Sequence, residues 1–367
     1  MLDRRLILNF DWVLFLQTLL LTGWGVVTIY SATHGRVENG LSTLYLRQLL
    51  WVIYGLIGLV ILLGIDYQRM EKYAYLLYLF AMALLLLTLL LGTTVSGSRR
   101  WLSVGIVSFQ PSELGKLGLI LALAKYFDEH NQRYYRLRDL GFPALLVSIP
   151  FLLIFEQPDL GTAFVLLAIF LAMLFVAGLH SRSLWILGGI GGAMLPVMWF
   201  FLLRDYQKER VTALFHPNAD PLGAGYHSNQ SKIAIGSGGL WGKGFLAGTQ
   251  SGLSFLPEKH TDFIFSVLAE ELGFLGAALL LLLYLCLLLK GLHIAYRAKD
   301  RFGMFLAVGV VAMIGIAVIA NIGMAIGVLP VVGIPLPLMS YGGSSAVSTL
   351  LGIGLLLNIR MRRFKRP

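Results

Sequence analysis

The clearest candidates for chemistry lie in the segment FLPEKHTDFIF, where a polar stretch meets an apolar run. This segment holds Glu258, Lys259, His260 and Asp262 close to one another. A carboxylate at such a boundary can accept a proton as a general base, and a neighbouring cation can hold an anionic group. The alternative is an interfacial charge cluster in which Asp262 caps the next helix. Spacing alone leaves both interpretations open.

A second candidate pair stands in FQPSELGKLG, at the start of another apolar run. Glu113 and Lys116 are three positions apart, so on a helix they share a face and can form an ion pair. The pair could fix helix packing, or Lys116 could point into a cavity and meet an anionic substrate. In FEQPDLGTA, Asp159 offers either a helix N-cap, the favoured interpretation, or a further carboxylate for a site.

The polar segment 204–262 is long and rich in glycine. Its stretch GSGGLWGKG, which includes Gly238 and Gly239, could cradle a phosphate with backbone amides, or it could be a hinge. It is not a Walker A loop, because its lysine is followed by glycine. Further along, Asn321 lies within an apolar run and Ser340 opens the motif SYGGSS. Both side chains suit hydrogen bonds between packed helices.

Several classes of protein have no motif in this sequence. It contains no His/Cys metal cluster, no GxSxG nucleophile elbow, no HExxH and no complete nucleotide-binding motif. The single cysteine excludes an intrachain disulfide. Chemistry driven by bound ATP is therefore disfavoured. What remains is a set of carboxylates, cations and glycines beside apolar runs.

The composition indicates what must position these residues. Of the 367 residues, 57% are hydrophobic and only 13% are charged. A soluble domain has about twice that charged fraction. The chain is therefore predicted to be an all-α polytopic membrane protein rather than a soluble enzyme or a DNA-binding domain, and no nucleic acid partner is expected. The net charge of +10 then indicates basic cytoplasmic loops.

The apolar runs define the expected spans, because a helix needs about 20 apolar residues to cross the hydrocarbon layer. About ten runs predict one integral membrane domain over 1–367, with 204–262 as a large extracytoplasmic loop between spans seven and eight. The fourth run is the weakest candidate for a membrane span, because it carries charged residues in its first turns. The expected spans are roughly 11–30, 45–64, 73–92, 110–127, 140–156, 160–178, 183–203, 263–290, 303–328 and 340–359.

Basic residues predict the orientation of these spans. Ten spans place both termini on one side of the membrane, and most of the 29 Lys and Arg residues fall in the termini and short loops of that side. Short cytoplasmic loops accumulate basic residues. Both termini are therefore predicted to be cytoplasmic, with 204–262 facing outward.

A set of motifs occurs in a characteristic order along the chain. They are QPSELGKL, QPDLGTA, DPLGAGYH, QSKIAIGSGGLWGKG, GTQ, FLPEKHTDFIFSVLAEELGFLG and PLMSYGGSS. In these motifs the sequence resembles the SEDS (shape, elongation, division and sporulation) proteins, from about residue 10 to about residue 360. FLPEKHTDFIF and FHPNADPLGAG are more similar to the elongation members than to the division members.

The resemblance implies a peptidoglycan glycosyltransferase of the bacterial cytoplasmic (inner) membrane. Such an enzyme polymerises lipid II, the undecaprenyl-diphosphate-linked disaccharide pentapeptide, at the outer face of the membrane. The resemblance also implies a class B penicillin-binding protein as transpeptidase partner, together with other membrane proteins of the elongation complex. The family's essential aspartate matches Asp262, and its paired Glu and Lys match Glu113 and Lys116.

The implied reaction gives the candidate residues distinct roles. Asp262 would accept the proton of the attacking sugar hydroxyl. The leaving lipid diphosphate needs countercharge, for which the candidates are Arg210, Lys116, Lys259 and a divalent cation such as Mg²⁺ or Mn²⁺; no other cofactor is expected. Two alternatives stay open, a lipid II flippase and a non-catalytic scaffold. A flippase needs a polar path across the whole membrane, whereas the ionisable residues cluster at the outer half.

Overall fold

The computed structural model describes residues 8–34, 43–95, 98–104, 107–216, 224–252 and 258–364. Within these ranges, nine helices are long and apolar enough to cross a membrane by length and composition. A further helix, α6, has a span's length of 19 residues but carries charged side chains. These helices correspond one for one to the predicted spans, so the all-α polytopic fold is confirmed. They are α2 Trp12–Thr33, α3 Leu44–Gly64, α5 Ala74–Leu91, α6 Pro111–Glu129, α7 Gly141–Glu156, α8 Leu160–Ala177, α9 Ser181–Val197, α13 Ile264–Tyr296, α14 Arg301–Ala325 and α15 Gly343–Arg362.

Shorter elements join the long helices. A 3₁₀ helix leads into α7 and a π-helical turn extends α9. Within the long loop, part of the chain is helical. The shorter elements are α4 Tyr67–Lys72, η3 Leu137–Leu140, η4 Met198–Leu202, α10 Asp205–Phe215, α11 Ala224–Ser237, α12 Thr249–Gly252, β1 Thr93–Val95, β2 Ser98–Val104 and β3 Val107–Phe109.

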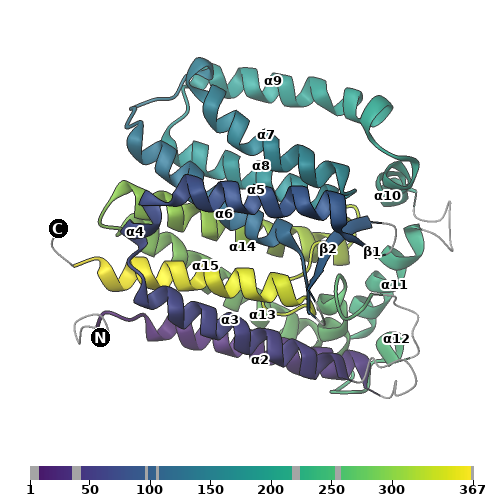
Figure 1. The fold of residues 1–367 in the computed structure, drawn as a ribbon. Helices are drawn as coiled ribbons and strands as arrows, with labels where there is room; N and C mark the ends of the chain where they lie inside the picture. The colour runs from purple at the N-terminus through teal and green to yellow at the C-terminus, as the bar shows by residue number, and fades with distance from the viewer. Residues whose placement is uncertain are drawn as a thin grey trace.

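The long helices lie side by side, with both chain termini and α4 at one end of the molecule and β1, β2, α10, α11 and α12 at the other (Figure 1). At the centre of the bundle, α14 packs against α6, α8 and α13, while α15 packs against α3. Helix α9 stands apart, and Ser183 is its one buried residue. The polar elements thus gather at the end opposite the termini.

A small antiparallel sheet precedes α6, in the connection between the third and fourth predicted spans. Its strand order is β1-β2-β3, and Leu102 pairs with Phe109 in the register of β2 and β3. The sheet feeds directly into α6, whose first position is Pro111. Proline suits that position because its missing N–H would have no intrahelical partner there. The sheet therefore fixes where α6 begins.

Helix α13 bends at Gly273, which has φ 65° and ψ −163°. The bend removes two helical hydrogen bonds, and the glycine-rich loop replaces them. The carbonyls of Glu270 and Glu271 accept from the loop amides of Lys243 at 3.0 Å and Gly244 at 2.9 Å. In return, the amides after the bend, at 274 and 275, donate to the loop carbonyls at 239 (2.9 Å) and 240 (3.2 Å). Loop and helix thus satisfy each other's backbone groups.

Candidate active site

Asp262 lies in a tight turn immediately before α13. The turn is closed by the carbonyl of Glu258, which accepts from the amides of Thr261 and Asp262 at 3.2 and 3.1 Å. Glu258 has a positive φ of 49°, an uncommon conformation for a residue with a side chain. The turn brings the Asp262 carboxylate to the polar end of the bundle, at the boundary predicted from the sequence.

Three successive carbonyls of this turn accept hydrogen bonds from residues much later in the chain. The His260 carbonyl accepts from the amide of Tyr341 at 2.8 Å, and the Thr261 carbonyl accepts from the Ser340 hydroxyl at 2.5 Å. The Asp262 carbonyl accepts from the side-chain amide of Asn321 at 2.9 Å. The backbone of the turn is therefore fixed independently of the Asp262 side chain.

Asn321 is completely buried in α14 and donates a second bond, at 2.8 Å, to the carbonyl of Ile334. It was expected to join helices, but it joins α14 to two irregular segments instead. Both segments border the site, since Asp262 belongs to one and Gly333 to the other. A Cβ atom added at Gly333 would lie 3.6 Å from Asp262 Oδ2.

Asn321→Ala is expected to destabilise the protein, because it leaves two carbonyls without their donor. A buried group that loses its partner costs about 1–3 kcal/mol. The measurement is thermal unfolding of the detergent-solubilised protein, together with its activity. Ser148→Ala is a matched control, since Ser148 is exposed and its hydroxyl donates to the Ala144 carbonyl of its own helix. An unchanged melting temperature for Asn321→Ala would show that these bonds do not hold the turn.

A cavity of about 150 Å³ opens in front of Asp262. Three of the predicted site carboxylates, those of Glu113, Asp159 and Asp262, line it although they are far apart in sequence. The remaining lining residues are mainly polar. They are Arg100, Trp101, Gln110, Thr162, Thr261, Gly333, Pro335, Tyr341, Gly342, Ser344 and Ser345.

Asp159 both caps α8 and faces this cavity. Its Oδ1 accepts from the amide of Thr162 at 3.1 Å, as an N-cap should. Its Oδ2 accepts from the side-chain amide of Gln110 at 3.1 Å and lies 3.7 Å from the Arg100 guanidinium. Arg100 also donates to the carbonyls of Gln157 and Pro158. The arginine is thereby held at the rim of the cavity.

Glu113 and Lys116 form a buried ion pair at 2.8 Å. The second oxygen of Glu113 accepts a hydrogen bond from the Ser348 hydroxyl of α15. Glu113 lines the cavity, whereas Lys116 does not. The lysine therefore neutralises the buried carboxylate from outside the cavity. Through the bond from Ser348 to Glu113, the pair also joins α6 to α15 next to the site.

The surroundings of Asp262 change its acidity. Burial, assisted by the negative charge of Glu258, raises the pKa of Asp262 to about 6. The positive charges of Arg210 and Arg100 oppose this shift. A carboxylate with this pKa is ionised at neutral pH and is a stronger base than an ordinary aspartate.

A second cavity of about 330 Å³ adjoins the first, because Arg100 lines both. Its walls are largely apolar and come from α8, α9, η4, α10 and the segment 330–332. Arg210 of α10 also lines it and donates to the Val331 carbonyl at 3.1 Å. Arg100 thus lies where the apolar cavity meets the polar one, and Arg210 lines the apolar cavity close enough for its charge to act on Asp262.

The other predicted residues lie around the site rather than in it. Ser340 supports the Asp262 turn, and the His260 ring lies 5.8 Å from the Tyr341 ring. Lys259 is buried, and its charge acts on Glu271 of α13. These three residues do not line either cavity.

The glycine-rich loop is also accounted for by packing. The amides of Gly238 and Gly239 donate to carbonyls of α11, and those of residues 242–244 donate to other protein carbonyls. A Cβ atom at Gly238 would lie 2.1 Å from the Ala269 carbonyl oxygen, so glycine is needed for close approach to α13. The predicted phosphate cradle at Gly238 and Gly239 is therefore not supported by this geometry.

Sequence reasoning missed the sheet residue Arg100 and the amide of Gln110. A signal was present for Arg100: it belongs to a basic pair in a short loop predicted to face outward, against the usual charge bias. In the described residues, no group of three His, Cys, Asp or Glu side chains is arranged to hold a metal ion.

Membrane-spanning helices that enclose a carboxylate-lined cavity at one end define a polytopic membrane protein with a site suited to acid–base chemistry. The chain matches the family model described as cell cycle protein, which covers FtsW, RodA and SpoVE, over residues 11–365. It is 45% identical over 317 residues to the peptidoglycan glycosyltransferase MrdB of Escherichia coli (strain K12), covering 86% of this chain and 85% of that protein. It is 40% identical over 355 residues to the stage V sporulation protein E of Bacillus subtilis (strain 168), covering 95% and 96%.

Two solved structures share the fold. A chain of a peptidoglycan synthase complex, described as coordinating polymerization and crosslinking, superposes with a TM-score of 0.83 at 35% identity over 97% of this chain and 99% of that chain. The rod shape determining protein RodA of Thermus thermophilus superposes with a TM-score of 0.73 at 34% identity over 97% and 98%. The chain belongs to the FtsW/RodA/SpoVE family, the SEDS proteins.

Proposed function

We propose that the chain polymerises lipid II into glycan strands at the outer face of the cytoplasmic membrane during cell elongation, with Asp262 as general base. The relatives supply the reaction class, since they are peptidoglycan glycosyltransferases along nearly the whole chain. The chain is thus a membrane enzyme of peptidoglycan synthesis. One observation carries the residue assignment: Asp262 faces a polar cavity with a pKa raised to about 6.

The base is needed because a sugar hydroxyl is a poor nucleophile at neutral pH. Asp262 would accept the hydroxyl proton as the new glycosidic bond forms. The donor sugar is α-linked to diphosphate and the product is β-linked, so one in-line displacement accounts for the inversion. The rigid backbone of the 260–262 turn would keep the carboxylate in place while the acceptor binds.

The leaving group determines the role of the arginines. A lipid diphosphate departs with negative charge, which nearby fixed cations stabilise. Arg100 lies where the polar and apolar cavities meet, and Arg210 lines the apolar one. The diphosphate would bind there, with the polyprenyl tail against the apolar walls and the sugar in front of Asp262. Lys116 and Lys259 would support the site without contacting the diphosphate.

The orientation proposed is that both termini lie in the cytoplasm. It is supported by the shared end of the two termini (Figure 1) and by the basic residues that gather there. The Asp262 cavity then faces outward, on the side where lipid-linked precursors are consumed.

Cysteine labelling tests this orientation. The test uses spheroplasts, whose cytoplasmic membrane is intact and accessible from outside. In a Cys286→Ser background, Trp241→Cys at the Asp262 end should react there with a membrane-impermeant maleimide. Tyr134→Cys, between α6 and α7, should react only after the membrane is opened. Both positions are exposed, so reactivity reports sidedness. The reverse pattern would contradict the proposed orientation.

A transpeptidase partner is also proposed. The structural neighbour comes from a complex that coordinates polymerization and crosslinking. Crosslinking requires a second activity beside glycan polymerisation, and a class B penicillin-binding protein would supply it. Other elongation proteins of the membrane would join the same assembly.

The test of the function is strand synthesis from lipid II by the purified protein, alone and with its transpeptidase partner, followed on gels. Wild-type protein should yield glycan strands. A protein that moves lipid II across vesicle membranes but never polymerises it would be a flippase. A protein that does neither and only assembles the complex would be a scaffold. Either outcome would overturn the proposal.

A further inference from the structure

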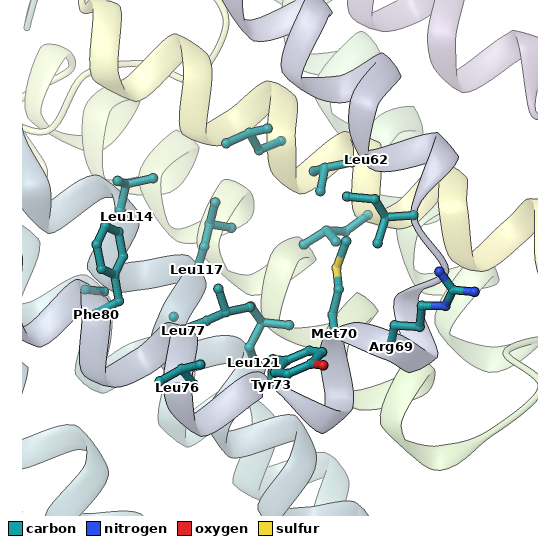
Figure 2. A pocket seen from close by; sticks show the side chains of 15 residues that line it. Leu62, Arg69, Met70, Tyr73, Leu76, Leu77, Phe80, Leu114, Leu117 and Leu121 are labelled. Carbon is teal, nitrogen blue, oxygen red and sulfur yellow. The ribbon is translucent and has the colours of Figure 1, made fainter.

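A third cavity runs along the bundle from α4, at the end of the chain termini, to Leu114 in the first turns of α6. It has a volume of about 660 Å³ and is bounded by α3, α4, α5, α6 and α15. This volume is within the range of about 300–1,000 Å³ found for ligand sites. Its walls are almost entirely leucine and other apolar side chains, as Figure 2 shows. The cavity therefore suits a hydrocarbon chain.

The cavity is open to the surface along α5. Leu76, Leu77 and Phe80 line it and are 62%, 40% and 60% exposed. Since α5 is a membrane-spanning helix, this exposed side faces the bilayer. A lipid chain can enter from the side without crossing the protein.

One end of the cavity is cationic. Figure 2 shows Arg69 at one end, with Phe80 and Leu114 at the other. Arg69 is exposed, and its guanidinium has no ion-pair or hydrogen-bond partner among the described residues. Lys72, one turn further along α4, places its ammonium 5.8 Å from the centre of the Tyr73 ring, which also lines the cavity. Two cations therefore border the mouth.

The acidic residue of α4 faces another direction. Glu71 does not line the cavity, and its charge acts on Asp128, Lys125 and Asp300. No carboxylate is among the residues that line the cavity. The mouth is thus complementary to an anion, and the interior to an alkyl chain.

We propose that this cavity binds an acyl chain of an anionic phospholipid, whose phosphate contacts Arg69 and Lys72. The lipid belongs to the leaflet at the end of the chain termini, because α4 lies there (Figure 1). A polyprenyl diphosphate is a poorer match, since its diphosphate would need the cations next to Asp262, and neither Arg100 nor Arg210 lines this cavity. Removing one cation from an anionic lipid site weakens binding roughly five-fold.

Binding of defined lipids to the delipidated full-length protein tests the proposal. Native mass spectrometry in detergent compares phosphatidylglycerol with phosphatidylcholine of identical chains. Wild-type protein should bind phosphatidylglycerol more tightly. Arg69→Ala should lower the affinity for phosphatidylglycerol roughly five-fold and leave the affinity for phosphatidylcholine almost unchanged. Leu77→Trp should weaken both lipids, because the indole fills the cavity.

Matched variants separate this site from general lipid adhesion. Arg138→Ala removes a cation whose side chain is 78% exposed, and Leu79→Trp enlarges an exposed α5 residue that does not line the cavity. Both should bind like wild type, and thermal unfolding checks that all variants fold. An unchanged lipid preference in Arg69→Ala, or unchanged binding in Leu77→Trp, refutes the site. Displacement of phosphatidylglycerol by an equal or lower concentration of undecaprenyl phosphate also refutes it. Because the readout is binding, it does not depend on the proposed catalytic activity.

Discussion

Asp262→Asn should leave the fold intact and remove strand synthesis. The amide is nearly isosteric with the carboxylate but is a very poor base, and loss of a positioned base costs about 10²–10⁴-fold in rate. The turn should keep its position because its carbonyls, not the Asp262 side chain, accept the bonds from Asn321 and Ser340. The measurement is the rate of lipid II polymerisation by purified variant and wild-type protein.

Asp205→Asn is the matched control, since Asp205 is an exposed carboxylate in the first turn of α10. It should retain wild-type activity. Asp262→Glu keeps the charge but moves it by one methylene, so partial activity at most is expected. Near-normal synthesis by well-folded Asp262→Asn would remove Asp262 from the catalytic step.

The pH dependence of the wild-type enzyme should carry the same signature. Asp262 acts as a base only when ionised, so activity should fall as pH drops through about 6. For stability the sign is opposite. The folded-state pKa is raised above the unfolded value of 3.8, so the Asp262 contribution to stability decreases as pH rises from about 4 to about 6. At pH 7.5, Asp262→Asn should therefore melt at the wild-type temperature or above it.

Separating Glu113 from Lys116 is expected to be more damaging than removing both. Lys116→Ala leaves a buried carboxylate without its countercharge, and breaking one side of such a pair costs about 3–5 kcal/mol. The double variant Glu113→Ala/Lys116→Ala removes both charges and should unfold at a higher temperature than either single variant. Polymerisation should fall in all three, because Glu113 lines the cavity.

Lys125→Ala is the matched control on the same helix. Lys125 lies 3.7 Å from the half-exposed Glu129, and such a pair contributes about 0–1 kcal/mol. Thermal unfolding in detergent and the gel assay should both be close to wild type for this variant. Normal folding and normal strand synthesis by both single variants of Glu113 and Lys116 would exclude both roles given to the pair.

The membrane spans could be predicted from the sequence because each one corresponds to a continuous run of apolar residues. The ion pair of Glu113 and Lys116 was also predictable, since both residues share one helix. The convergence of Asp159, Asp262 and Glu113 on one cavity was not, because it depends on how three separate helices pack. Their motifs nevertheless marked each residue separately.

The sheet that carries Arg100 escaped prediction for a different reason. Its segment is rich in turn residues, and its strands are short. The glycines of 236–244 were also ambiguous, because close approach to a ligand and close approach to another backbone both require glycine. Only the position of α13 distinguishes the two, through the bonds that Lys243 and Gly244 make.

The bend at Gly273 makes the shape of α13 depend on a segment outside the helix. Without the loop of Lys243 and Gly244, the carbonyls of Glu270 and Glu271 would lose the two amides that they now accept from, and a straight helix would be the arrangement that satisfies them. The docked loop and the bent helix therefore form one unit that neither segment can adopt alone.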